Sequence, residues 1–147
     1  MPIRFFYEEI EFKLPHPVKI KKWLGVSAEK EKKTIKDINY IFCSDAFLLQ
    51  LNQKYLNHQT LTDIITFDNS SEKAIAGEIY ISIDRVAENA HGYKVDFMTE
   101  VRRIMIHGVL HLCGYSDKRK SEKILMRKKE DTYLSLWPNL FHVKRSS

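Results

Sequence analysis

The sequence is poor in the features that mark secreted, membrane and multidomain proteins. Its 147 residues include only two cysteines, Cys43 and Cys113, which are too few for a disulfide framework. No hydrophobic run approaches the roughly 18 apolar residues that a membrane-spanning helix needs. The segment MPIRFFYEEIEF carries glutamates where a secretory signal would be hydrophobic, so we expect a cytoplasmic protein with no membrane partner.

The sequence also lacks internal repeats, low-complexity tracts and linkers. Its hydrophobic fraction of 44% and charged fraction of 29% are typical of a soluble globular protein. The chain is long enough to bury a core without disulfides. We therefore expect one domain over residues 1–142, followed by a flexible basic tail over residues 143–147, and a monomer.

Hydrophobic periodicity predicts a single α/β (α+β) domain with about four strands and five helices. The short connection between the last two strands favours an antiparallel pair inside a mixed sheet. Asp45 is a candidate N-cap for the second helix. We expect strands over 3–12, 38–44, 63–68 and 77–84, and helices from residue 17 and over 46–56, 85–93, 97–114 and 121–137.

Positive charge is concentrated in one segment. The formal net charge is +5, and residues 118–130 alone contain seven lysines or arginines against two glutamates. A basic stretch of this kind favours a polyanionic partner, although it is also compatible with a solvated helix face.

The stretch HGVLHLCGYSD, residues 107–117, carries a candidate metal site. His107 and His111 lie four residues apart in a predicted helix, and imidazoles at this spacing can chelate one ion. Gly114 is suited to the left-handed residue that ends a helix, after which Asp117 can return as a third ligand. Cys113 is the competitor, but it lies about 200° around the helix from His111.

The chemistry of this motif points away from peptide hydrolysis. Zinc peptidases with a His-x-x-x-His helix have a glutamate general base after the first histidine, and Gly108 stands there. A metal ion, most simply zinc, can itself generate a hydroxide nucleophile, and the basic segment suggests a phosphodiester substrate. Lys118 and Arg119 are then candidate phosphate contacts.

The motif resembles that of the YbeY family of metal-dependent endoribonucleases. HGVLHLCGYSD is accompanied in the same order by LNQKYLNHQTLTDIITF, GEIYISID and EKILMRKKE. The resemblance implies a zinc-type ion held by His107 and His111, and cleavage of single-stranded RNA. It also implies a role in 3′-end maturation of small-subunit ribosomal RNA and in ribosome quality control, with the small ribosomal subunit or its assembly factors as partners.

Two positions depart from the family pattern. Asp117 stands where the usual third ligand is a histidine, and a carboxylate there makes the ion a weaker Lewis acid. Leu56 stands where the family has an arginine that contacts phosphate, so His58, Lys54 or another cation must substitute, or activity is reduced.

Two further interpretations remain open. Asp63 matches the family pattern and is a candidate hydrogen-bond acceptor that orients a ligand histidine, or else a residue that stabilises a turn or a helix cap. The alternative to an enzyme is a weakly catalytic or non-catalytic RNA-binding factor for ribosome assembly, with a structural metal site.

Overall fold

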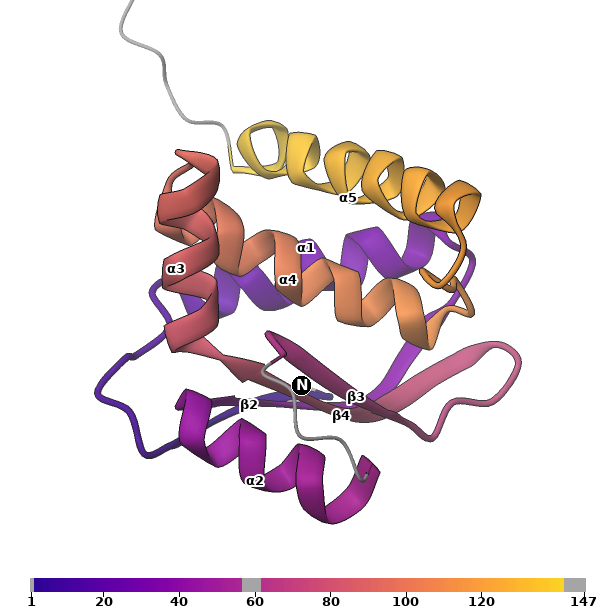
Figure 1. Ribbon diagram of the computed structural model, residues 1–147. Coiled ribbons are helices and arrows are strands. Elements are labelled where there is room, and N and C mark those ends of the chain that lie inside the picture. The colour runs from indigo at the N-terminus through magenta and orange to yellow at the C-terminus, as the bar shows by residue number, and fades with distance from the viewer. Residues whose placement is uncertain (1, 57–61, 142–147) are drawn as a thin grey trace, which may run out of the picture.

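A four-stranded mixed sheet forms the centre of the protein, with helices on both of its faces (Figure 1). The computed structural model describes residues 2–56 and 62–141; the predicted tail at 143–147 lies outside them. The described residues contain the expected four strands and five helices. In chain order these are β1 (Ile3–Glu8), α1 (Pro17–Lys30), β2 (Thr34–Cys43), α2 (Asp45–Leu56), β3 (Ile64–Asp68), β4 (Ala74–Ser82), α3 (Ile83–Tyr93), α4 (Phe97–Leu112) and α5 (Lys120–Leu140).

The sheet has the strand order β1-β2-β4-β3. β2 lies parallel to both β1 and β4, whereas β3 and β4 form the antiparallel pair predicted from their short connection. β2 and β4 are both longer than predicted at their N-terminal ends, because Thr34 pairs with Ala74 in the parallel ladder. The predicted α/β fold is confirmed.

Helix α4 lies against one face of the sheet, α2 covers the other, and α5 forms an outer layer over α4 (Figure 1). Gly108 explains how α4 fits so closely onto the strands. A Cβ atom at this position would lie only 2.9 Å from Cδ1 of Ile79 and 3.3 Å from Cδ1 of Ile64. The absent side chain lets the helix segment that carries both histidines approach β3 and β4.

The predicted capping role of Asp45 is wrong. The hydroxyl of Ser44 accepts the hydrogen bond from the backbone N–H of Phe47, while Asp45 lies inside the first turn of α2. The Asp45 carboxylate instead accepts hydrogen bonds from Ser82 and Arg85, and so joins α2 to the start of α3.

Among the described residues, no helix is both long and apolar enough to cross a membrane. The longest, α5, has 21 residues and carries all of the basic segment except its first two residues, Lys118 and Arg119.

Candidate metal centre

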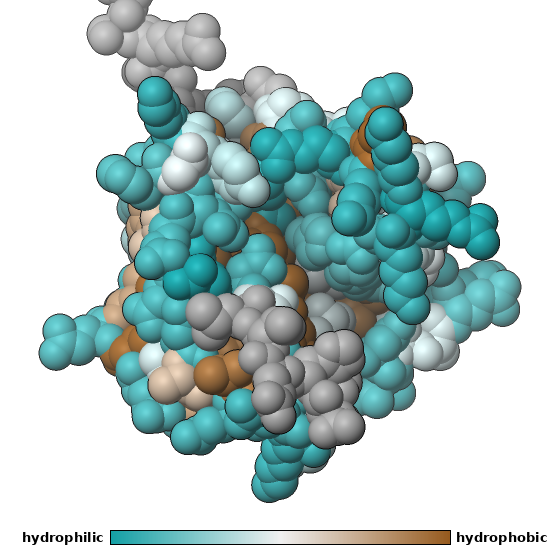
Figure 2. Space-filling model, in the orientation of Figure 1, coloured by the Kyte–Doolittle hydropathy of each residue, from teal (hydrophilic) through white to brown (hydrophobic). Residues whose placement is uncertain are grey.

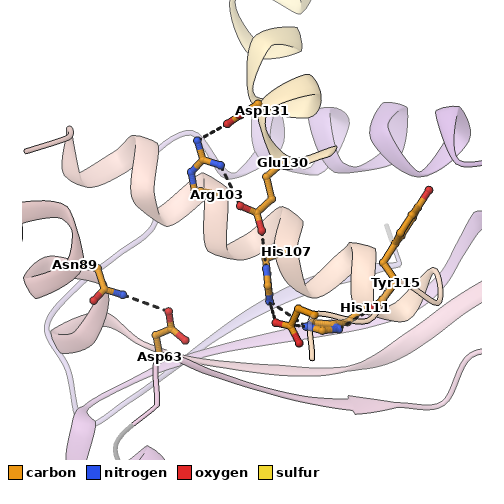
Figure 3. A network of polar contacts seen from close by, with 9 residues as sticks. Asp63, Asn89, Arg103, His107, His111, Tyr115, Glu130 and Asp131 are labelled. Atoms are coloured by element: carbon orange, nitrogen blue, oxygen red, sulfur yellow. Dashed lines mark hydrogen bonds and ion pairs between the residues drawn. The ribbon is translucent and has the colours of Figure 1, made fainter. Parts of the chain in front are cut away.

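The structure brings His107, His111 and Asp117 together at the end of α4. The two Nε2 atoms lie 2.9 Å apart, and Oδ2 of Asp117 lies 3.2 Å from Nε2 of His107 and 3.4 Å from Nε2 of His111 (Figure 3). Within the described ranges, this is the one group of three histidine, cysteine or acidic residues close enough to hold a metal ion. Cys113 is outside it.

A tight helix end returns Asp117 to the histidines. Gly114 has φ of 104° and donates its N–H to the carbonyl of His111, while Tyr115 donates to the carbonyl of Leu110. These two bonds form a Schellman motif, in which the left-handed residue reverses the chain after the last helical turn. The prediction for Gly114 is confirmed.

Both imidazoles are fixed through their Nδ1 atoms. His111 Nδ1 lies 3.0 Å from the carbonyl oxygen of Tyr115, and His107 Nδ1 lies 2.6 Å from Oε2 of Glu130 (Figure 3). A carbonyl oxygen or a carboxylate only accepts, so the hydrogen of each neutral ring belongs on Nδ1. Two Nε2 lone pairs and the Asp117 carboxylate oxygen then face one another, which is an arrangement that can hold a cation.

Burial and charge influence the two histidines differently. Burial lowers the pKa of His107, but the hydrogen bond and charge of Glu130, together with Asp117, outweigh it and raise the pKa above its usual value. The pKa of His111 is lowered, chiefly by burial and then by the adjacent His107. The pKa values of the two neighbouring rings are therefore shifted in opposite directions.

These residues fit a divalent metal ion. Two imidazole nitrogens and a carboxylate oxygen match the three-ligand set of catalytic zinc sites. Their side chains are 15%, 26% and 39% exposed for His107, His111 and Asp117, so the group is open on one side. The thiol of Cys113 has its pKa raised by burial to about 11, which further disfavours it as a thiolate ligand.

The triad lies in a cleft of about 890 Å³ between α5 and the β3 edge of the sheet. Hydrophilic side chains dominate this face of the molecule and surround its hollow (Figure 2). Besides the triad, the polar and charged residues that line the cleft are Thr62, Asp63, Thr66, Asp68, Asn89, Tyr93, Glu100, Arg103, Lys123, Arg127 and Glu130.

Asp63 lines the cleft but does not hold a histidine. Its carboxylate accepts a hydrogen bond of 3.2 Å from the side-chain amide of Asn89, and the acceptor at His107 is Glu130 (Figure 3). Burial is the largest influence on the Asp63 carboxyl and raises its pKa, although the charge of His107 opposes this.

Of the other predicted contacts, Lys54, Lys118 and Arg119 are not part of the cleft lining. Lys54 is exposed on α2, across the sheet, with its ammonium 5.2 Å from the ring of Tyr55. Lys118 and Arg119 are exposed in the connection to α5 and do not line the cleft. The N–H of Arg119 donates to Glu122 at the start of α5. His58 lies outside the described residues.

Two further charged residues of α4 line the cleft. Glu100 is 7% exposed and lines the cleft, and burial raises its pKa. Arg103 donates to Glu130 at 3.0 Å and to Asp131 at 2.7 Å (Figure 3). Arg103 lies one helical turn before His107, and this spacing in the sequence could have predicted that Arg103 lies beside the site.

A second polar group lies behind His111. The hydroxyl of Tyr115 donates to Glu31 at 2.6 Å, and Glu31 also accepts from Lys129 at 3.0 Å and from Tyr133. Because the carbonyl of Tyr115 holds His111, this group links the end of α1 and the middle of α5 to the second imidazole. No sequence pattern singled out Glu31.

Fold and site together define an α/β protein with an open candidate metal centre of two imidazoles and a carboxylate. The model of the family described as Endoribonuclease YbeY matches residues 8–137. A relative from Flavobacterium psychrophilum, named Endoribonuclease YbeY, is 50% identical over 141 residues, covering 96% of this chain and 98% of its own. The chain belongs to the YbeY family.

A second relative and a solved structure are also similar to this chain. A relative of the same name from Cytophaga hutchinsonii is 50% identical over 135 residues, which cover 91% of this chain and 94% of the relative. A solution structure of a Thermotoga maritima protein superposes with a TM-score of 0.66 at 27% identity, covering 94% of this chain and 91% of that one.

Proposed function

We propose that this protein is a metal-dependent endoribonuclease that cleaves single-stranded regions of ribosomal RNA. The observation that carries the proposal is the convergence of two Nε2 lone pairs and the Asp117 carboxylate in an open cleft, in a chain of the YbeY family. A divalent ion held there would supply Lewis acidity and a water of lowered pKa.

The chain's own residues prepare the site for that chemistry. Glu130 and the Tyr115 carbonyl keep both imidazoles in the tautomer that offers Nε2. Asp63 acts on His107 through its charge, without a hydrogen bond to it. We assign the catalytic role to His107, His111 and Asp117.

We propose zinc as the metal, the cytoplasm as the compartment and a monomer as the working form. The process is 3′-end maturation of small-subunit ribosomal RNA and ribosome quality control, with the small subunit or its assembly factors as partners. The net charge of +5 supports a polyanionic substrate.

A metal and cleavage assay on one ligand variant tests the assignment. We expect His111→Ala to lose bound metal by elemental analysis, together with chelator-sensitive cleavage of an RNA with single-stranded ends. His91→Ala is the matched control, because His91 is exposed on α3 and outside the cleft lining. Full metal stoichiometry in His111→Ala would refute the site.

The alternative is an RNA-binding assembly factor with a structural metal site, which the substitution of Leu56 for the expected arginine favours. The open triad speaks against it, because structural zinc sites are closed by four protein ligands. The Leu56→Arg variant distinguishes the enzyme from the assembly factor. If the protein is an enzyme, this variant should cleave RNA much faster than the wild type. If wild type and variant both bind metal and RNA but neither cleaves RNA, the assembly factor is supported.

A further inference from the structure

We propose that Lys123 and Arg127, on the side of α5 that faces the cleft, bind backbone phosphates of the RNA beside the candidate metal centre. This inference rests on the proposed function and names the contacts that hold its substrate. Both residues line the cleft that contains the triad, whereas the basic residues predicted for this role, Lys118 and Arg119, do not.

The charges of Lys123 and Arg127 are available to a ligand. Across residues 2–56 and 62–141, neither side chain has a hydrogen bond or an ion pair. Arg103, the third lysine or arginine of the cleft, is held by Glu130 and Asp131. A mobile RNA phosphate therefore has these two cations, and not Arg103, to pair with.

The placement of the two residues suits a strand that runs along the helix. Lys123 and Arg127 are four residues apart on α5, which puts their Cβ atoms about 5–6 Å apart on one helix face. Of the cleft's acidic side chains, Asp63, Asp68 and Glu100 belong to other elements. Glu130 is on α5, but its carboxylate is already paired with Arg103 and His107. Repulsion by the first three carboxylates leaves the α5 side of the cleft as the favourable place for phosphates.

Lys123 and Arg127 also compensate for the missing arginine at position 56. Leu56 provides no charge where an arginine was expected, and Lys54 is on the α2 side of the sheet. Lys123 and Arg127 supply positive charge to the cleft from α5 instead. In this proposal, the phosphate contacts are made by α5, which follows the triad, and not by α2, which precedes β3.

Anisotropy with a labelled single-stranded RNA tests the proposal on the zinc-loaded protein. Lys123→Gln/Arg127→Gln is compared with Lys120→Gln/Lys128→Gln, which removes the same charge from exposed positions of α5 outside the cleft lining. We expect the cleft variant to bind roughly tenfold more weakly than the control. Its slope of log affinity against log salt should fall by about 1.4, since each single-strand phosphate contact contributes about 0.7.

The outcomes distinguish a failure of this proposal from a failure of the proposed nuclease function on which it rests. Both variants should keep the metal content and melting temperature of the wild type. Equal affinity and equal salt slope in the two variants would overturn the role of Lys123 and Arg127 and leave the nuclease assignment standing. A wild-type protein that neither binds nor cleaves RNA would overturn the proposed function itself.

Discussion

At the scale of single residues, the site depends on which ring nitrogen carries the hydrogen. His107 and His111 offer Nε2 because Glu130 and the Tyr115 carbonyl occupy Nδ1. The two acceptors differ in kind, since a carboxylate adds a negative charge to the site and a carbonyl adds only a dipole. Glu130 therefore contributes both the orientation of its ring and part of the charge that a cation needs.

Replacing this carboxylate should weaken metal binding while keeping the fold. We expect Glu130→Gln to lower zinc affinity roughly 10–100-fold, because an amide still fills the space but holds the His107 tautomer less strongly. Competition with a chromogenic chelator gives the affinity. Glu29→Gln, on an exposed position of α1, is the control and should match the wild type.

At the scale of elements, α5 holds the site together from outside. Glu130 contacts His107, while Lys129 and Tyr133 hold Glu31, which in turn accepts from Tyr115. One face of this helix therefore supports both imidazoles. The Glu31 side chain is 8% exposed, so its carboxylate depends on these donors.

The contribution of the Glu31 carboxylate to folding stability should depend on pH. Burial raises the pKa of Glu31, but hydrogen bonds from Tyr115, Tyr133 and Lys129 together lower it below 4.5. A carboxyl group whose pKa is lower in the folded state than in the unfolded state stabilises the fold at pH values above its unfolded-state pKa. This stabilisation is lost as the pH falls through the folded-state pKa. We expect Glu31→Gln to cost about 1–3 kcal/mol at pH 7.

Urea unfolding of wild type and Glu31→Gln at pH 7 and at successively lower pH measures this difference. The gap between the two proteins should narrow as pH falls below about 4.5, the ordinary value for this carboxyl. A gap independent of pH would mean that Glu31 contributes by packing alone.

The sequence predicted those parts of the site that depend on local spacing. His107 and His111 share a helix face, and Gly114 determines the turn that returns Asp117, so periodicity and one glycine were sufficient. Glu31 and Glu130 could not be found in this way. Glu130 lies 23 residues from His107, inside a basic run that was interpreted as a contact for a polyanion or as a solvated helix face, and its burial follows only from the packing of α5 on α4.

At the scale of the whole molecule, metal binding and folding should be coupled. The ligands are assembled only in the folded chain, so an ion at about 100 times its dissociation constant should add about 2.7 kcal/mol of stability. We expect zinc to raise the melting temperature by about 5–10 °C and a chelator to reverse this. Asp117→Asn should show a much smaller rise in calorimetry.

The two anchors of the imidazoles also differ in how far along the chain they lie. The anchor of His111 is four residues away and forms with the helix end itself, whereas that of His107 must arrive from a separate helix. We therefore expect the local contact of His111 to form without α5, whereas His107 is oriented only when α5 is docked on α4. Tight metal binding would then require the docked helix, and an ion in the cell would stabilise chains in which this contact is made.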